Sequence, residues 1–351
     1  MTQKIRKSDL LINPRRLIIS TRGHKMGDVI FSLPIATLLK QRFPDIVIGF
    51  IGTSYTKAII EACSSIDFFI EKHDFLTQTI TLNGLQPDCL LHVIPNRQMA
   101  KRAKELKIPL RIATNRRLYH WLTCNKLVPL KRRNSLLHEI QLNLEILKAF
   151  DMKYQFSLSE IPPLYALPEL ASCFTHSHLL AKNKFKLIIH PKSGGSAKEW
   201  HLQRYIELIE LLDADKFQIF ISGSSAEKML LQPLFEKVGH KVTNICGQLD
   251  LNEFTGLVAS CDALIACSTG PLHLAAALGK YALGIYAPRS PIFARRWGPV
   301  GKNAHVFALE NSNCHNCVEN DANCLCMDTI EPQQIKQALD LIYTEFYKQG
   351  S

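Results

Sequence analysis

Short apolar runs alternate with longer amphipathic segments along most of the chain. Nine of these runs are candidate strands, at residues 17–20, 46–51, 89–94 and 110–113 in the first half and at 186–190, 217–222, 242–246, 263–266 and 282–286 in the second. Uninterrupted apolar runs of this length are typical of strands buried on both faces of a parallel sheet. The segments between them carry apolar residues at helical spacing, as at 202–212. The pattern predicts an α/β protein with two Rossmann-like, doubly wound parallel sheets facing a cleft.

A proline-containing segment of weak periodicity, 159–184, separates the two halves. We predict an N-terminal domain over residues 1–165 and a C-terminal domain over 185–330, because 351 residues exceed what one core usually holds. The last residues, 331–351, are amphipathic, and we expect them to form a helix that packs back towards the N-terminal domain.

Composition indicates a cytoplasmic protein. The apolar runs stay well short of the roughly 18–20 residues that span a bilayer, and the N-terminus lacks the apolar core and cleavage site of a signal peptide. The eleven cysteines are an odd number and are scattered, which favours reduced thiols over a disulfide framework.

The positive charge is concentrated in one segment. Residues 95–138 contain twelve Lys and Arg side chains and one acidic residue, Glu105, so this segment alone accounts for the net charge of +11. A localised cationic surface predicts a polyanionic partner, such as a phosphorylated substrate, an anionic membrane surface or nucleic acid. The alternative is a solvated surface without a partner, although such surfaces normally contain more acidic residues.

The stretch 267–279 has the pattern of a phosphate-binding turn. It follows the apolar run 263–266, turns through Ser268-Thr269-Gly270 and enters a small-residue helix with Pro271 in its first turn. Free backbone N–H groups and the helix dipole at such a strand–turn–helix junction favour an anion. His273 lies one turn further on and is placed to reach the same anion.

A second candidate loop, 190–200, also follows a strand. It contains Ser193, a Gly-Gly pair and Lys198, which are donors suited to a phosphate, although the spacing is not that of a Walker A loop. After the next strand, Glu227 is a candidate for binding a ribose diol, but Ser224-x-x-Glu227 is also the pattern of a capping box.

Asp28 opens the predicted helix after the first strand, at the sheet edge where ligands bind in this architecture. We expect the positive helix end to keep it ionised, so that it can accept a proton from an attacking hydroxyl. An equally good interpretation is that Asp28 caps the helix. Pro34 lies within the same predicted helix and indicates a break or kink.

Two further patterns suggest metals only weakly. Asp213-Ala214-Asp215 resembles a metal-binding D-x-D but sits between a helix and a strand, so a turn is the preferred interpretation. Four cysteines near the C-terminus have irregular spacing, which leaves a structural zinc site open but favours unligated thiols; they are Cys314, Cys317, Cys324 and Cys326.

Taken in series, the motifs resemble glycosyltransferase family 9, the heptosyltransferases of lipopolysaccharide core assembly. The matching pieces occur in family order over nearly the whole chain. They are Met26-Gly27-Asp28 with Leu33-Pro34, His190-Pro191 with Lys198-x-Trp200, Gly223 with Glu227, and Thr269-Gly270-Pro271-x-His273.

The resemblance implies a GT-B fold and an inverting hexosyl or heptosyl transfer. The donor would be an ADP-sugar bound mainly by the C-terminal domain, with no cofactor or metal required. It assigns the catalytic base to Asp28 and the ribose contact to Glu227. It assigns the phosphate contacts to Ser193, Lys198, Thr269, Gly270 and His273. The family usually has Asp directly before the Thr/Ser-Gly pair, where it touches sugar hydroxyls. Ser268 stands there in this chain, so the charge-assisted contact is lost. The identity of the transferred sugar therefore stays open.

In the mechanism that follows, Asp28 takes the proton of an acceptor hydroxyl while Lys198 and the turn at Thr269 stabilise the departing diphosphate. The basic segment of the N-terminal domain would hold an anionic lipid A–Kdo acceptor at the inner face of the cytoplasmic membrane, with the protein bound peripherally. The residues assigned to that role are Arg97, Arg116, Arg117, Lys131, Arg132 and Arg133. The alternatives are a transferase or epimerase of the same fold acting on another sugar, or a non-catalytic binding protein. Nucleic acid is not an expected partner, because no recognised RNA-binding motif is present.

Overall fold

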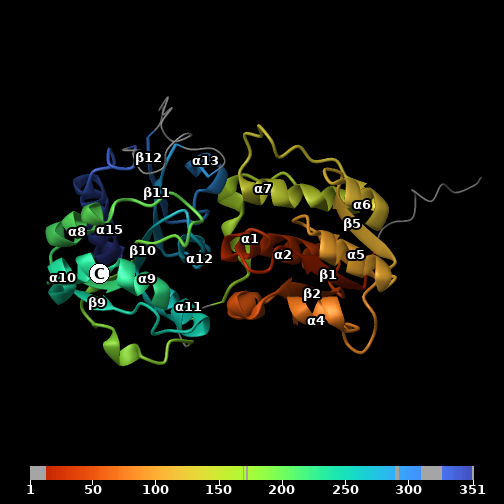
Figure 1. Ribbon diagram of the computed structural model, residues 1–351, viewed down its shortest axis with the longest axis horizontal. Helices are drawn as coiled ribbons and strands as arrows, with labels where there is room; N and C mark the ends of the chain where they lie inside the picture. The colour runs from red at the N-terminus through yellow and green to blue at the C-terminus, as the bar shows by residue number, and fades with distance from the viewer. Residues whose placement is uncertain (1–12, 169, 171–172, 289–291, 310–325, 350–351) are drawn as a thin grey trace, which may run out of the picture. The chain divides into compact units, whose positions relative to one another are not determined.

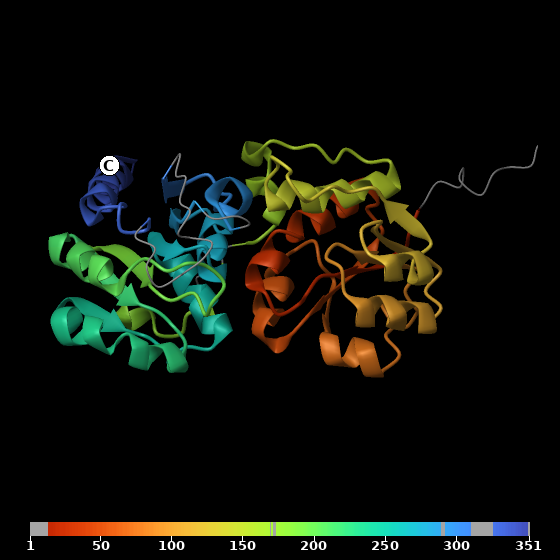
Figure 2. The same cartoon turned by 45° about the horizontal axis from the view of Figure 1, so that its top comes forward.

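The computed structural model describes residues 13–168, 170, 173–288, 292–309 and 326–349 (Figures 1 and 2). By contacts the chain divides into two units. The first comprises Met1–Ser135 and Glu139–Ala166, and the second comprises Leu136–His138 and Leu167–Ser351. The sequence predicts domain boundaries at 165 and 185. In Figure 1 the first unit is coloured red to yellow-green and the second green to blue.

The first unit is built on a six-stranded parallel sheet in the order β3-β2-β1-β4-β5-β6. Its strands are β1 (Arg16–Ser20), β2 (Val47–Gly52), β3 (Phe68–Glu71), β4 (Cys89–His92), β5 (Leu110–Thr114) and β6 (Lys126–Val128). Its helices are α1 (Met26–Ile30), α2 (Leu33–Arg42), α3 (Lys57–Ala62), α4 (Lys72–Thr77), α5 (Arg97–Glu105), α6 (Leu118–Thr123) and α7 (Glu139–Leu144). The strand order reverses between β1 and β4, which makes their carboxyl ends the switch point of the sheet.

The second unit repeats this topology, with the order β12-β11-β10-β7-β8-β9 and every neighbouring pair parallel. Its strands are β7 (Phe185–His190), β8 (Phe217–Ile221), β9 (Val242–Asn244), β10 (Ala263–Cys267), β11 (Tyr281–Tyr286) and β12 (Ala304–Ala308). Its helices are α8 (Leu202–Leu211), α9 (Ser225–Leu230), α10 (Gln232–Val238), α11 (Leu251–Ser260), α12 (Gly270–Ala277), α13 (Ala294–Trp297) and α15 (Pro332–Gln349). Here the switch point lies between β7 and β10.

Short 3₁₀ turns complete the described secondary structure. They are η1 (Ser54–Thr56), η2 (Glu145–Phe150), η3 (Leu158–Glu160), η4 (Pro162–Tyr165), η6 (Ser177–Leu179) and η7 (Gly239–Lys241). Within the described ranges, no helix is both long and apolar enough to cross a membrane.

The predicted α/β architecture with two doubly wound parallel sheets is confirmed, and all nine predicted strands are present. Sequence reasoning missed β3, β6 and β12. All three are short strands at a sheet edge, and few of their residues are fully buried. Because an edge strand is covered on fewer sides, its residues do not form the continuous apolar run by which a central strand is found.

Helix α15 packs within the second unit. It contacts α8, and Ile335, Leu339 and Ile342 on its apolar face belong to the same buried cluster as α8. The sequence predicts instead that this segment packs towards the N-terminal domain. Amphipathicity shows only that a helix has an apolar face to bury, and the partner that buries it is decided by the three-dimensional arrangement.

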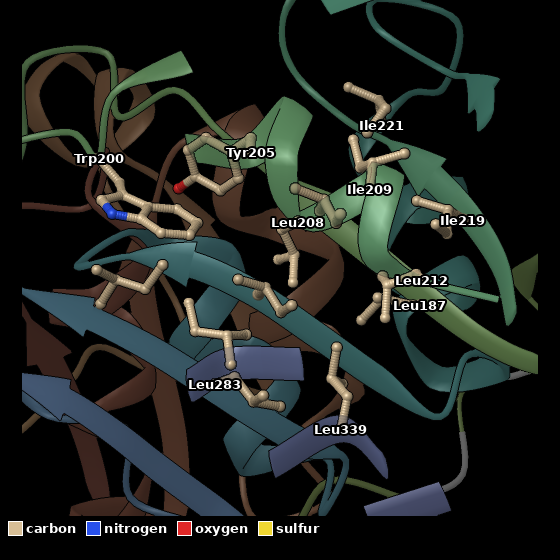
Figure 3. Packing of buried hydrophobic residues seen from close by; sticks show 14 of the residues in the cluster. Leu187, Trp200, Tyr205, Leu208, Ile209, Leu212, Ile219, Ile221, Leu283 and Leu339 are labelled. Carbon is tan, nitrogen blue, oxygen red and sulfur yellow. The ribbon is translucent and has the colours of Figure 1, made fainter. Parts of the chain in front are cut away.

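The core of the second unit joins α8, α15 and one face of the sheet (Figure 3). Leu187 and Ile219 from neighbouring strands point into this cluster, where Leu208 of α8 meets them. At one end, the rings of Trp200 and Tyr205 pack edge to face at 4.9 Å, a geometry that favours aromatic pairs. The cluster anchors the loop that precedes Trp200, which returns below as part of the candidate site.

Replacing Leu208 by Ala tests this core. Leu208 is fully buried, so Leu208→Ala should lower the free energy of unfolding by about 2–5 kcal/mol through lost burial and the cavity left behind. Leu211→Ala on the same helix is the control, since Leu211 is 44% exposed and should change stability far less. Urea unfolding followed by far-ultraviolet circular dichroism measures both. Equal losses in the two variants would contradict the assigned packing.

Candidate active site

The turn after β10 brings a helix N-terminus to the switch point of the second sheet. Thr269 is the N-cap of α12, in an extended conformation, and Pro271 occupies the first turn of the helix, as predicted. Among the described residues Thr269 Oγ1 has no hydrogen-bond partner, although the residue is only 4% exposed. Buried hydroxyls are nearly always hydrogen-bonded. The threonine hydroxyl is therefore available to a group that the protein itself does not supply.

The loop between β7 and α8 is organised by Glu199, a residue that sequence reasoning missed. Glu199 Oε1 accepts hydrogen bonds from Ser193 N at 2.8 Å and Ser193 Oγ at 3.0 Å, and Oε2 pairs with Lys192 Nζ at 2.8 Å. The hydroxyl of Ser196 contacts the backbone oxygen of Ser268 at 3.4 Å, which links this loop to the turn after β10. Both predicted phosphate-binding segments thus meet at one sheet edge.

The charge of Glu199 is stabilised by these contacts. Burial alone would raise the pKa of Glu199, but the hydrogen bonds from Lys192 and Ser193 lower it below its ordinary value. The same contacts occupy the predicted phosphate ligand Ser193, whose backbone N–H and hydroxyl both point to Glu199. Lys198, in the same loop, is half-buried. Glu199 therefore fixes the loop that carries Lys198.

Glu227 lies beside the same loop and also caps α9. Its Oε2 accepts hydrogen bonds from Ser224 N at 2.7 Å and from Ser224 Oγ at 2.9 Å, which is the capping box that the sequence allowed. Its other oxygen, Oε1, lies near Gly194: a Cβ atom at that glycine would be 3.9 Å from it. The capping role is established by these bonds, and the second carboxylate oxygen faces the glycine loop.

Two histidines at this edge are held neutral by burial. Burial and the neighbouring His138 lower the pKa of His273 to about 3, and burial lowers the pKa of His190 to about 4 although Glu227 and Glu199 oppose it. His138 Nε2 donates a hydrogen bond to the backbone oxygen of Gly298, 160 positions away in sequence, at 2.9 Å. Sequence reasoning missed His138, because nothing local places residue 138 with the second unit. Neutral imidazoles can donate to a phosphate oxygen without carrying charge.

In the first unit, Asp28 lies in α1, the helix that follows β1 in sequence. The helix break indicated by Pro34 is confirmed: α1 ends at Ile30, and α2 starts at Leu33 with Pro34 as its second residue. Asp28 is not the helix cap, because that position is held by Lys25. Within the described part of the chain, Asp28 Oδ2 has no hydrogen-bond partner, and its nearest cation is Arg22, whose Nε lies 3.6 Å away.

Burial dominates the ionisation of Asp28. The residue is 5% exposed, and burial raises its pKa above the ordinary value, with Arg22 acting in the opposite direction. Burial therefore opposes the expected stabilisation of the Asp28 charge by the helix end, since removing a carboxylate from water penalises its charged form. A carboxylate with a raised pKa and an unbonded oxygen is suited to accept a proton.

Arg132 is part of the framework around Asp28. It pairs with Glu139, donates to Asn143 Oδ1 at 2.8 Å and is largely buried. Asn143 in turn donates to the backbone oxygen of Phe31 at 3.2 Å, in the break between α1 and α2. The Arg132 guanidinium is thus engaged by protein groups, and its predicted contact with an acceptor stays a prediction. Its charge also lowers the pKa of Asp28.

The other cations of the basic segment differ from Arg132 in their exposure. The side chains assigned to the acceptor that are exposed to solvent are Arg97, Arg116, Arg117, Lys131 and Arg133. The exposed positive charge of the first unit is therefore smaller than the composition indicates, but it is still substantial.

Two buried histidines near β4 and β5 were not singled out from sequence. His92 ends β4, pairs in register with Ser20, and is fully buried. Its ring stacks on His120 at 5.8 Å, and neither of its ring nitrogens has a hydrogen-bond partner among the residues that the structure describes. Burial, with a smaller contribution from His120, lowers the pKa of His92 to about 3.

The weak metal patterns have separate outcomes. Asp213 Oδ1 accepts a hydrogen bond from Asp215 N at 2.9 Å, which is the turn that the sequence favoured. Cys314, Cys317 and Cys324 lie outside the described residues. Cys326 is described and is buried.

Comparison with known proteins agrees with this geometry. The sequence model of glycosyltransferase family 9 (heptosyltransferase) matches residues 107–327, so the chain belongs to this family. The chain is 27% identical over 297 residues to a Haemophilus influenzae protein named "Putative glycosyltransferase", covering 81% of this chain and 86% of that protein. It is 32% identical over 121 residues to lipooligosaccharide heptosyltransferase 2 of Haemophilus ducreyi, covering 33% of this chain and 34% of the relative.

The fold has a known counterpart. The structure of Escherichia coli ADP-heptose LPS heptosyltransferase II has a TM-score of 0.74 at 18% identity, covering 95% of this chain and 99% of that one. Together with the two six-stranded parallel sheets, this likeness establishes the GT-B fold. The family membership makes the protein a glycosyltransferase.

Replacing His92 tests the effect of burying a neutral imidazole. An unfolded chain protonates histidine near pH 6.5, whereas folded His92 has a pKa of about 3. Between these values the unfolded state binds more protons, so acidification lowers stability. His92→Leu removes this effect. The difference in free energy of unfolding between His92→Leu and the wild type should therefore be more favourable to the variant by about 2 kcal/mol at pH 5 than at pH 7.5.

The measurement is urea unfolding at pH 7.5, 6 and 5, with the exposed His73→Leu of α4 as the control. A His92→Leu variant whose stability falls with acidification as steeply as that of the wild type would contradict the assignment.

Proposed function

We propose that this glycosyltransferase moves a heptose from an ADP-linked donor onto the inner core of lipopolysaccharide, with a lipid A–Kdo saccharide as acceptor and with inversion at the anomeric carbon. The observation that carries the proposal is Asp28. It is a buried carboxylate with an unbonded oxygen and a raised pKa, in the helix that follows the first strand of a chain of family 9. The heptosyltransferase names of the relatives support the choice of sugar.

In this mechanism the acceptor oxygen forms a bond to the anomeric carbon as the bond from that carbon to the diphosphate breaks. Asp28 takes the proton of the acceptor hydroxyl, so the oxygen attacks with increasing negative charge. The departing diphosphate receives the electron pair of the broken bond. Lys198 and the N–H groups at the start of α12 stabilise its charge, and Thr269 supplies a hydroxyl.

Ser268 bears on the identity of the sugar. It is 7% exposed and lies near the hydroxyl of Tyr286, which itself donates to the backbone oxygen of Trp297 at 2.6 Å. A neutral hydroxyl at this position still binds a sugar oxygen, but more weakly than a carboxylate does. A transferase for another ADP-sugar is the alternative. Incubation with different donors separates the two, and free ADP with an enlarged acceptor excludes an epimerase.

We propose further that the acceptor is held by the exposed cations of the first unit and that the protein works peripherally at the inner face of the cytoplasmic membrane. Phosphates and carboxylates of a lipid-linked saccharide are the anionic groups that such a surface attracts. Arg116, Arg117 and Arg133 support this role because they are exposed, whereas Arg132 is engaged within the unit.

Asp28→Asn tests the base. The substitution keeps the shape of the side chain but removes the basic oxygen, so kcat should fall by about 10²–10⁴-fold while the Kd for the donor stays unchanged. Transfer is followed by chromatography of released ADP and mass spectrometry of the acceptor, and donor binding by calorimetry. Asp45→Asn, at an exposed position of the same unit, is the control. A kcat for Asp28→Asn close to that of the wild type would remove the carboxylate from the mechanism.

Lys198→Ala tests the diphosphate site. Loss of one charge-assisted contact of about 1.5–3 kcal/mol should weaken ADP binding by about 10–100-fold. Lys237→Ala, on the exposed surface of α10, should bind ADP as the wild type does. Calorimetric titration with ADP decides between them. Wild-type affinity in Lys198→Ala would show that this lysine lies outside the donor site.

A further inference from the structure

Helix α6 turns an apolar face to solvent. Leu118, Trp121 and Leu122 are 87%, 62% and 73% exposed, and their spacing of three and four residues puts them on one side of the helix. His120 on the other side is fully buried. An ordinary surface helix buries its apolar stripe and exposes its polar one. In α6 this arrangement is reversed, so three large apolar side chains are exposed to solvent.

This face is held firmly in place. The indole N–H of Trp121 donates to the backbone oxygen of Asn115 at 3.2 Å, and His120 Nδ1 contacts the backbone oxygen of Thr114 at 2.8 Å. At the far end, Lys104 of α5 donates to the oxygen of Leu122 at 2.9 Å. With its single polar atom satisfied by the protein, the Trp121 ring presents an apolar surface at a fixed position.

Cations border the apolar face. Arg116 and Arg117 directly precede α6 and are exposed. Helix α5 lies against α6, and its Arg97 and Lys104 are also exposed. Arg97 and Arg117 both act electrostatically on Tyr119 of α6, which places these two charges close to the helix. An apolar centre with a cationic border matches a layer that has anionic groups outside and hydrocarbon beneath.

We propose that α6 docks this glycosyltransferase on an anionic lipid bilayer, with Leu118, Trp121 and Leu122 entering the headgroup region and the neighbouring arginines and lysines binding lipid phosphates. Tryptophan is enriched at the interface between membrane and water, and the Trp121 ring brings a large apolar surface whose N–H is already bonded to Asn115. A second copy of the chain is a poorer partner, since it would bring an equally positive surface. The inference rests on the proposed function, for which it supplies the surface that meets the membrane.

The test is sedimentation with vesicles of phosphatidylcholine alone and of phosphatidylcholine with 30% phosphatidylglycerol, at low and high salt. The wild type should bind the anionic vesicles, and less so at high salt because screening weakens the cationic contacts. The triple variant Leu118→Ser, Trp121→Ser, Leu122→Ser should partition at least about tenfold less. The control Met229→Ser, Leu230→Ser removes two comparably exposed apolar side chains from α9 of the second unit and should bind as the wild type does.

Fluorescence locates the docking residue in the intact protein. The chain has three tryptophans, and Trp200 is 2% exposed within the core. In a Trp297→Phe background, Trp121 is therefore the reporter. Lipids brominated near the top of their acyl chains should quench its emission more than lipids brominated deeply, because the helix lies at the headgroup boundary. Quenching that does not differ from that of Trp121→Phe would overturn the proposal.

Several outcomes separate this proposal from the proposed function. If the triple variant loses vesicle binding but transfers sugar to a soluble, delipidated acceptor as the wild type does, the docking surface is established. If the wild type binds anionic vesicles but transfers no sugar, the docking surface stands and the proposed function fails. Docking is overturned if the wild type does not bind anionic vesicles. It is also overturned if light scattering shows that the apolar face mediates self-association, so that the triple variant differs from the wild type only in its oligomeric state. Arg116→Gln, Arg117→Gln keeps the apolar side chains and should lose the preference for anionic vesicles, which guards against misfolding of the triple variant.

Discussion

The reversal of strand order at the centre of each parallel sheet is the constraint on which the candidate site depends. Connections leave β1 and β4, and likewise β7 and β10, in opposite directions, so the carboxyl ends of these strands are not crossed by their own loops. Asp28 follows β1, and the turn at Thr269 follows β10. Each of these two segments therefore lies at the switch point of its own sheet. The same order in both units means that one topological rule positions the proposed base and the proposed donor site.

Burial sets the charge state of most ionisable groups at these edges. It raises the pKa of Asp28 and lowers those of His273 and His190. Glu199 is the exception, since donors surround its carboxylate and its pKa falls. The difference has a simple cause: a buried charge persists only where hydrogen bonds or an opposite charge replace the lost water. In the second unit, a charged Glu199 thus organises the loop of Lys198 beside two imidazoles that stay neutral.

The basic segment shows how one stretch of sequence can serve different structural purposes. Arg132 is drawn inward and supports the helix break beside Asp28 through Glu139 and Asn143. Arg116 and Arg117 stay at the surface next to the apolar face of α6. A count of charges treats these residues alike. Their physical roles differ because a guanidinium paired with a buried carboxylate no longer attracts a distant anion.

Local pattern in the chain was sufficient for the α/β architecture, the central strands, the break at Pro34 and the strand–turn–helix at Thr269, because each depends on neighbours within a few residues. The motif series was also sufficient to indicate the family. Only the tertiary structure showed that Glu199 organises the loop of Lys198, that His138 reaches Gly298, and that α15 packs on α8. These features depend on which distant segments meet, and neither hydrophobic periodicity nor motif spacing carries that information. The exposure of the apolar face of α6 is likewise visible only in the tertiary structure, since burial is a property of the folded chain and not of the helix alone.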